Sequence, residues 1–369
     1  MKITSISTYL IEIPFETGAP TQALNAHQWR RMAILFVRVE TDAGLVGWGE
    51  AFGHASAVGT KAFVDTLVAP QFIGRDPTEI ASLMGEIGQR IHHYGRNGPV
   101  IYGLSGIDLA LWDIAGKRAG LPVAALLGGA RRTEFPAYAS LLRYTEPEVV
   151  ALMSARAVAE GYGYVKLHEI EVAPVEAARR AIGPKIGLML DTNCPWTVAE
   201  AVAMAQALKP CDLYWLEEPV WPPEDHEGLA QVRATGTIVA AGENATGFHD
   251  FRHMFEAKAV DVAQPSVTRV GGITEARRIY ALAEAYGVRI VPHCAYFGPG
   301  YLASLHLHAA LAPDAPFERL YLKLEASPFG DWLEIRNGHA RLPTGPGLGC
   351  DPDMDIVQRY LVQPVTVTK

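Results

Sequence analysis

Apolar and polar positions alternate with a period of two in the amino-terminal part of the chain. Residues 3–13 and 32–41 follow this pattern, which is typical of half-buried antiparallel strands. Asp42-Ala43-Gly44 separates the second strand from another apolar run at 45–50, and this spacing predicts a hairpin. Residues 16–31, between the first two strands, are too polar and irregular for a core element, so we interpret them as a loop.

The period then changes to that of helices. Residues 59–68, 80–91 and 102–118 carry apolar side chains at helical spacing. Gly120-Leu121-Pro122 ends the third helix. Strands followed by helices predict an α+β unit in this part of the chain.

From about Phe135 the pattern becomes a repeat in which short apolar runs alternate with helical segments. The eight runs are 135–141, 164–168, 186–191, 213–217, 238–243, 259–264, 289–292 and 320–325. Such alternation predicts parallel strands with right-handed crossovers, and eight of them at near-constant spacing predict a closed β/α barrel. The glycine-rich phosphate loop of an open doubly wound sheet is absent after the first run. The tail after Leu342 is rich in Gly and Pro and is expected to return to the amino-terminal unit.

Composition and charge indicate which partners and which cellular compartment to expect. The chain has 369 residues, enough for a barrel and a smaller unit, and its net charge of −8 disfavours nucleic acid and anionic membranes as partners. The four cysteines are scattered without a CxxC pair, which favours a reducing compartment. The chain shows neither a signal-peptide pattern nor an apolar run of the ~18 residues that a membrane span needs. We therefore expect a cytoplasmic protein with a small-molecule substrate.

Ionisable residues end several of the predicted strands. Lys166 and His168 close the second run, and Asp191, Glu217 and Glu243 close the next three, at steps of roughly 25 residues that match one strand–helix unit. Their side chains are therefore expected side by side on the rim where barrel enzymes place their active sites.

Three carboxylates at one rim repel each other unless a cation holds them. A ligand set of oxygens, without thiolate or imidazole, suits Mg²⁺, so Asp191, Glu217 and Glu243 are the candidate metal ligands. Strand alternation favours Glu217 over Glu218, because Glu217 shares a strand face with Trp215.

The candidate bases flank this trio. Lys166 and His168 are two residues apart and so face the same side of their strand, where one can hold a substrate carboxylate and the other can take a proton. His293 follows the seventh run, on the opposite side of the barrel mouth. Two bases on opposite sides of one carbon serve racemisation, epimerisation or dehydration. Glu325, at the end of the eighth run, is a candidate contact for the substrate carboxylate.

Several motifs resemble the mandelate racemase/muconate lactonizing enzyme family of the enolase superfamily. They are GLVGWGE at 44–50, LSGIDLALWDIAGK at 104–117, LEEP at 216–219, AGE at 241–243, VGGIT at 270–274 and GPGLG at 345–349. The resemblance covers nearly the whole chain. It implies a (β/α)7β modified TIM barrel over 129–342, with an α+β capping domain over 1–128 that about 343–369 completes.

The resemblance also implies chemistry. Members of this family bind Mg²⁺ on the three carboxylates and remove the α-proton of a carboxylate substrate to give an enediolate. The polar loop at 16–31, which contains His27, and the segment 52–54 would close over the pocket and select the substrate. Relatives of this kind commonly assemble, so a homo-oligomer is expected.

The candidate bases resemble those of the mandelate racemase-like subgroup, but the sequence differs from that subgroup's pattern at two positions. Gln264-Pro265-Ser266 stands where the muconate-lactonizing type has its lysine, whereas His293 matches the mandelate racemase type. The second strand carries Lys-x-His where Lys-x-Lys is commoner, so His168 occupies the position of the usual base. Ser266 stands where an aspartate that orients the histidine is expected, and a serine cannot stabilise imidazolium as a carboxylate does. Asn193 and Ser266 complete the candidate substrate contacts.

Three hypotheses remain open at this point. The first is a Mg²⁺-dependent dehydratase of a sugar acid, which the ligand trio, the flanking bases and the polar loop favour. The second is a racemase, epimerase or cycloisomerase that shares the same first step. The third is a sugar-acid-binding protein without turnover, which only the missing aspartate at Ser266 supports.

Overall fold

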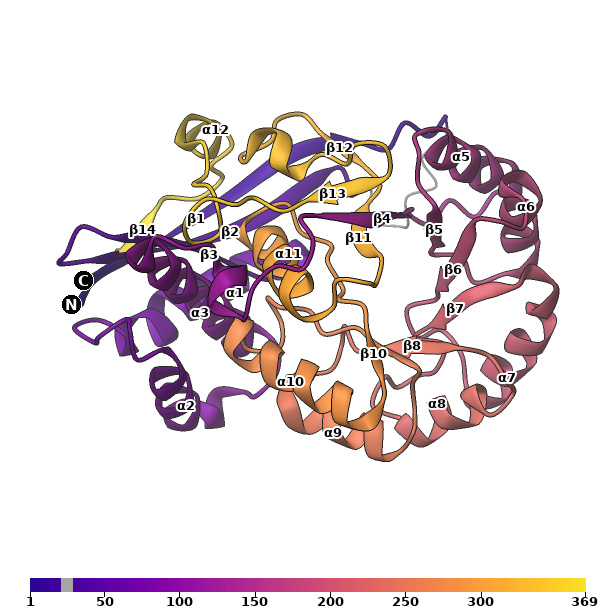
Figure 1. Ribbon diagram of the computed structural model, residues 1–369, viewed down its shortest axis with the longest axis horizontal. Helices are drawn as coiled ribbons and strands as arrows, with labels where there is room; N and C mark the ends of the chain where they lie inside the picture. Colours follow the sequence, from indigo (N-terminus) through magenta and orange to yellow (C-terminus); the bar gives the residue numbers. More distant parts are fainter. Residues whose placement is uncertain (21–28) are drawn as a thin grey trace.

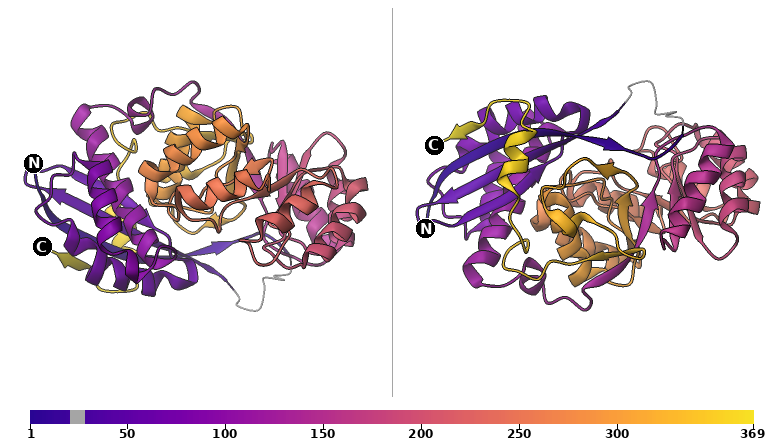
Figure 2. Two further views of the ribbon diagram at one scale, coloured as in Figure 1. Left: turned by 90° about the horizontal axis from the view of Figure 1, so that it is seen from below. Right: turned by 90° about the horizontal axis from the view of Figure 1, so that it is seen from above.

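The computed structural model of the protein describes residues 1–20 and 29–369. A capping unit, which contains both chain termini, lies beside a barrel unit (Figure 1). Two further views show the amino-terminal helices of the capping unit packed on one face of its sheet (Figure 2). His27, a predicted substrate contact, lies outside the described residues.

The capping sheet is an antiparallel meander that the carboxyl-terminal segment completes. Strands β1 (Ile3–Glu16), β2 (Arg31–Thr41) and β3 (Val46–Ala51) pair in sequence order, with the predicted hairpin at 42–44. Strand β14 (Thr366–Thr368) pairs with the middle of β1. The tail therefore returns to the amino-terminal unit, as its composition predicted.

Glycines let the main capping helix lie close to the sheet. Helix α3 (Pro99–Ala119) packs on β3, and a Cβ atom added at Gly49 would lie 1.8 Å from the backbone oxygen of Gly106 on α3. The equivalent Cβ at Gly47 would lie 2.1 Å from the oxygen of Ala110. The GLVGWGE and LSGIDLALWDIAGK motifs therefore meet at one close contact between backbones.

The other elements of the capping unit are short helices. They are η1 (His54–Ser56), α1 (Ala57–Phe63), η2 (Val64–Val68), η3 (Ala69–Gln71), α2 (Ile80–Arg90), η4 (His92–Tyr94), α4 (Val123–Leu126), η6 (Gly330–Leu333) and α12 (Met354–Arg359). Apolar residues of α1, α2 and α3 are buried against the sheet in one core cluster.

Eight parallel strands form the barrel, in the order β10-β9-β8-β7-β6-β5-β4-β11. The strands are β4 (Glu134–Ser140), β5 (Tyr164–Leu167), β6 (Gly187–Asp191), β7 (Leu213–Glu217), β8 (Val239–Ala241), β9 (Val262–Ala263), β10 (Arg289–Ile290) and β11 (Phe317–Leu320), and β13 (His339–Arg341) adds to β4. The helices between them are α5 (Pro147–Ala159), α6 (Val172–Ile182), α7 (Val198–Ala207), η5 (Lys209–Cys211), α8 (His226–Arg233), α9 (Gly247–Glu256), α10 (Gly272–Tyr286) and α11 (Pro299–Leu311). The barrel interior is filled by large apolar side chains that include Tyr138, Met189 and Trp215.

The eighth strand lies earlier in the chain than the sequence pattern predicted. The prediction was 320–325, but β11 ends at Leu320, and Lys323–Leu324 form β12, which pairs with β1 of the capping sheet. The strand was missed because Glu318 and Arg319 interrupt its apolar pattern. Glu318 is nevertheless buried inside the barrel, where it meets a lysine.

Buried carboxylates of the capping unit bind the amino termini of two barrel helices. Glu50 on β3 accepts a hydrogen bond of 2.8 Å from the backbone N–H of Gly300 in the first turn of α11. Asp108 on α3 accepts one of 3.0 Å from the N–H of Thr274 in α10. The first N–H groups of a helix have no partner within the helix. The two carboxyl groups supply the missing acceptors and so join the capping unit to the barrel unit. Burial raises the pKa of Glu50 to about 8 and that of Asp108 to about 7.

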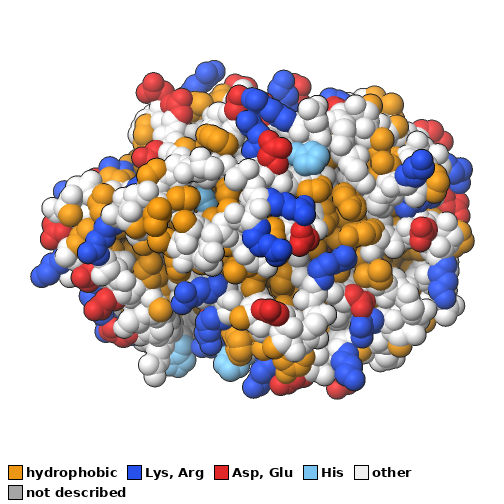
Figure 3. Space-filling view, in the orientation of Figure 1, with side chains coloured by type: hydrophobic (Ala, Val, Ile, Leu, Met, Phe, Trp, Pro, Cys, Tyr) orange, Lys and Arg blue, Asp and Glu red, His pale blue; other side chains and the backbone are white. Residues whose placement is uncertain are grey.

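The outer surface is mixed in character. On the face shown in Figure 3, acidic and basic side chains are interspersed with apolar ones. None of the helices in the described ranges combines the length and apolar character needed to cross a membrane.

The contact between Glu50 and α11 gives a stability prediction. Glu50→Ala leaves the buried N–H of Gly300 without its acceptor, and we expect the free energy of unfolding to fall by about 1–3 kcal/mol. Urea denaturation followed by circular dichroism measures this change. The exposed Glu284 on α10 provides the control, and Glu284→Ala should stay within about 0.5 kcal/mol of the original protein. Equal stabilities for the two variants would contradict the proposed role of Glu50.

Candidate active site

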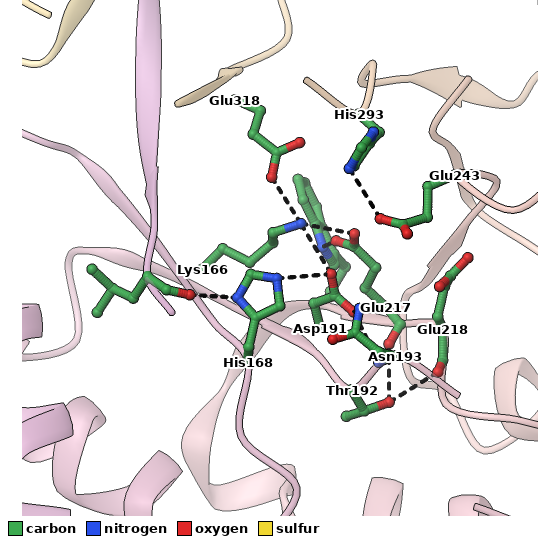
Figure 4. A network of polar contacts seen from close by, with 12 residues as sticks. Lys166, His168, Asp191, Thr192, Asn193, Glu217, Glu218, Glu243, His293 and Glu318 are labelled. Atoms are coloured by element: carbon green, nitrogen blue, oxygen red, sulfur yellow. Dashed lines mark hydrogen bonds and ion pairs between the residues drawn. The ribbon is translucent and has the colours of Figure 1, made fainter. Parts of the chain in front are cut away.

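The predicted metal ligands and bases meet at the carboxyl-terminal rim of the barrel. Strands β6 and β7 are in register so that Asp191 lies beside Glu217, and Lys166 lies on the neighbouring β5. Figure 4 shows Lys166 pointing among the carboxylates, with His168 on one side and His293 on the other. Adjacent parallel strands that each end in an ionisable residue thus bring side chains about 25 residues apart into one cluster.

Asp191, Glu217 and Glu243 form a set that fits a metal ion. One carboxylate oxygen from each of the three lies within 4.8 Å of the others. Burial, and then the charge of Asp191, raise the pKa of Glu217 well above its ordinary value, so the crowded carboxylates favour a cation between them. Oxygen donors alone are the preferred ligands of hard divalent ions. Glu218 turns away and accepts a 2.8 Å hydrogen bond from Asn244 Nδ2.

Lys166 is a buried cation among three carboxylates. Its Nζ lies 3.2 Å from Asp191 Oδ2, 2.9 Å from Glu217 Oε1 and 2.9 Å from Glu318 Oε1, and the side chain is 1% exposed. Burial opposes the charge of this lysine, but the surrounding carboxylates outweigh burial and raise the pKa of Lys166 well above its usual value. The lysine therefore stays positively charged, as a group that holds a substrate carboxylate must be.

Glu318 is a site residue that the sequence reasoning missed. Besides contacting Lys166, its carboxylate accepts a 2.7 Å hydrogen bond from the backbone N–H of Cys294, which follows β10. The contact spans β10 and β11, the two ends of the hydrogen-bonded strand order. The available signal was an acidic residue inside the short segment Phe317–Leu320, which begins and ends with apolar side chains.

His168 has a defined tautomer. Its Nδ1 contacts the backbone oxygen of Leu141, which can only accept, so Nδ1 carries a hydrogen. Nε2 is then the nitrogen that faces the cluster, 3.2 Å from Asp191 Oδ2. Arg143 Nε donates to the backbone oxygen of His168 and fixes the segment. A ring held in this way directs Nε2 toward the carboxylate cluster.

His293 stands across the cluster from His168 (Figure 4). Its Nε2 lies 3.1 Å from Glu243 Oε2, and its Nδ1 lies 3.0 Å from the hydroxyl oxygen of Ser266. Burial lowers the pKa of His293. The two imidazoles therefore flank the carboxylate trio from opposite sides.

The predicted substrate contacts have different positions. Asn193 donates from its backbone N–H and from Nδ2 to Asp191 Oδ1, at 3.0 and 2.9 Å, so it supports a candidate ligand. Ser266 is buried behind His293. Glu325 is not part of the cluster: it follows β12, accepts a 2.8 Å hydrogen bond from Tyr360 Oη and is half exposed. Its predicted place is wrong because the eighth strand ends at Leu320, five residues earlier in the chain.

Aromatic residues of the capping unit line one side of the site. The ring of His54 stacks on Phe52 at 4.9 Å and contacts Trp29 at 5.2 Å. Arg269 lies 4.8 Å from the Phe52 ring centre, and its Nη1 is 3.2 Å from Glu243 Oε1. Burial lowers the pKa of His54 to about 4, so this ring is neutral. Sequence reasoning did not identify Arg269, which follows Ser266 in an otherwise uncharged stretch.

Comparisons with known proteins agree with this geometry. Residues 148–356 match the family model described as "Enolase C-terminal domain-like", and residues 6–128 match the "Mandelate racemase / muconate lactonizing enzyme, N-terminal domain". D-galactarolactone cycloisomerase of Agrobacterium fabrum is 34% identical, over 98% of this chain and 99% of the relative. D-xylonate dehydratase of Haloferax volcanii is 33% identical, over 90% and 86%. The crystal structure of the 3,6-anhydro-D-galactonate cycloisomerase from Zobellia galactanivorans is 31% identical and superposes with a TM-score of 0.85, over 98% of this chain and 100% of that one.

The carboxylate trio predicts stabilisation by divalent cations. A ligand that binds only the folded state adds about 2.7 kcal/mol at a hundred times its Kd, so Mg²⁺ should raise the melting temperature. We expect Glu243→Gln to lose this rise, because one of the three oxygen ligands becomes a neutral amide.

Glu218→Gln is the matched control, since Glu218 is a buried neighbour that points away from the trio. It should keep most of the Mg²⁺-dependent rise. Thermal melts with and without Mg²⁺ measure the response, and similar responses in the two variants would overturn the ligand assignment.

Proposed function

Because the chain belongs to the mandelate racemase/muconate lactonizing enzyme family, we propose that it is a Mg²⁺-dependent enzyme that dehydrates a sugar acid. The relatives named D-xylonate dehydratase and D-galactonate dehydratase support this substrate class. The first step is removal of the proton on the carbon next to the carboxylate. Loss of the neighbouring hydroxyl as water then gives a 2-keto acid.

One observation carries the proposal: two imidazoles lie on opposite sides of a carboxylate trio that fits a divalent cation. His168 Nε2 is 3.2 Å from Asp191, and His293 Nε2 is 3.1 Å from Glu243. A substrate bound at the trio thus has a candidate proton acceptor on one face and a second proton-handling group on the other. Dehydration needs both, since a proton leaves the α-carbon and another must reach the departing hydroxyl.

The remaining charged groups have roles that follow from their positions. Lys166 is the buried cation nearest the trio and is proposed to hold the substrate carboxylate. Asp191, Glu217 and Glu243 are proposed to hold Mg²⁺, with Asn193 keeping the Asp191 carboxylate in place. When bound, the metal supplies positive charge that stabilises the enediolate as it forms. The aromatic side chains of the capping unit help to exclude water from the site.

A second candidate function shares this first step. The 34% identical relative and the superposed structure are both named as cycloisomerases. Cycloisomerisation removes the same α-proton, but an oxygen of the substrate itself leaves or adds, so the product is an isomer of the substrate. The product distinguishes the two functions directly.

The test is a screen of the purified, Mg²⁺-loaded protein against aldonates, aldarates and their lactones. Dehydration gives a 2-keto acid that has lost one water by mass spectrometry, whereas cycloisomerisation gives a product of unchanged mass. A folded, metal-loaded protein that forms no 2-keto acid from any of these compounds would contradict the dehydratase proposal. An isomer of unchanged mass would support the second function in its place.

Removal of each imidazole should have unequal effects. His168→Ala should abolish exchange of the α-proton with deuterated solvent, because it removes the proposed base. His293→Ala should reduce product formation while retaining part of the exchange, since Ser266 cannot stabilise an imidazolium as a carboxylate would. Proton NMR of the substrate in deuterated water measures exchange, and equal loss in both variants would show that His293 is as effective a base as His168.

A further inference from the structure

A pocket that holds an unpaired cation lies outside the active site, against β11. Successive side chains of a strand point to opposite faces, so Arg319 points away from the barrel interior that contains its neighbour Glu318. Directly after β11 the chain continues into β12, η6 and β13, and a pocket of about 370 Å³ lies on this outer face. A volume of this order is typical of small-molecule sites. The lining contains none of the candidate metal ligands or bases.

Aromatic side chains form walls of this pocket. Phe297, Tyr162 and Tyr321 line it and are buried. The rings of Tyr162 and Tyr321 pack edge to face, with centroids 5.8 Å apart. The guanidinium carbon of Arg319 lies 4.0 Å from the centre of the Phe297 ring, so an aromatic ring covers one face of the cation. A flat apolar molecule would find ring surfaces here against which it can pack.

The edge of the same guanidinium lacks an acceptor. Nη1 of Arg319 is buried and has no hydrogen-bond partner within residues 1–20 and 29–369. Burial lowers the pKa of Arg319, but an arginine side chain stays charged in proteins. A buried charged donor without an acceptor costs free energy, so such groups are normally paired. An anion in the pocket would supply the acceptor that the described chain does not.

The other cations of the lining already face carboxylates. Arg156 Nε lies 3.1 Å from Glu160 Oε1, and Lys323 stands opposite Glu16 in the register of β1 and β12. The remaining acidic side chain of the lining, Glu334, is exposed to solvent. The buried guanidinium is therefore the group that would attract an anion into the pocket.

We propose that this pocket is a second ligand site, separate from the catalytic cluster, and that it binds a small aromatic carboxylate. The carboxylate group accepts hydrogen bonds from the Arg319 guanidinium, whose planar fork matches it. The ring of the ligand packs against Tyr162 and Tyr321. The proposal does not depend on the function proposed above, since its residues are not those of the catalytic cluster.

Binding of para-fluorobenzoate to the Mg²⁺-loaded protein, followed by fluorine NMR, tests this site. We expect Arg319→Gln to weaken binding at least about tenfold, because it removes one charge of the ion pair. Arg180→Gln is the matched control, since Arg180 is an exposed arginine of α6 that pairs with Glu176, and its loss changes the net charge equally. It should leave the affinity unchanged. Equal affinities in the two variants, or no binding by the original protein up to about 10 mM, would overturn the proposal.

Two further probes define the class of ligand. The amide para-fluorobenzamide has the same shape without the charge, and inorganic phosphate has charge without the ring. Both should bind at least about tenfold more weakly than para-fluorobenzoate. An amide that binds as tightly would contradict the pairing with Arg319. A phosphate that binds as tightly would contradict the role of the aromatic walls.

The cost of the unpaired charge gives an independent test by thermal melting. Arg319→Met replaces the cation by an apolar side chain, so in buffer without organic anions the variant should melt at no lower a temperature than the original protein. Addition of para-fluorobenzoate should raise the melting temperature of the original protein and not that of the variant. A variant that fails to fold, or that melts at a clearly lower temperature, would assign Arg319 a structural role and overturn the proposal.

Discussion

The site depends on the balance of charge around Lys166. Three carboxylates that are almost fully buried lie within about 3 Å of one ammonium group, and the barrel strands fix all four positions. Isolated buried charges are costly, so removal of any one partner leaves the others without compensation. Under the proposed function, a divalent cation and an anionic substrate, whose charges are opposite, would enter this already ordered cluster. Arg269 plays the corresponding part for Glu243 on the far side, where His293 also contacts this carboxylate.

The sequence predicted the features that follow from regular spacing. Asp191 and Glu217 end successive strands and Glu243 follows the next one by two residues, so a strand–helix period was enough to bring them together. Alternation along β7 also separated Glu217 from Glu218, which turns to Asn244. The capping sheet and its hairpin followed from the period of two.

Features that depend on irregular chain paths were not predicted. Glu325 was assigned to the site because an apolar run was taken as the eighth strand, whereas that segment joins the capping sheet. Glu318 of β11 is instead the residue that contacts Lys166 in the cluster. The charged residues of β11 interrupt the apolar pattern that would have identified this strand. Arg269 contacts the site from the loop after β9, and no period specifies how a loop folds. The prediction for His27 falls outside the described residues.

Glu50 and Asp108 have a consequence for how such a protein can be rebuilt. Each belongs to the capping unit, yet each completes the first turn of a barrel helix, α11 or α10. A barrel excised from this chain would expose two helix ends that evolved with acceptors supplied from outside. A chimaera that grafts a different cap to change specificity must therefore transplant these two carboxylates as well as the residues that line the pocket. The hydrogen bonds shared between the units, and not the linker alone, therefore define what must be exchanged in such a chimaera.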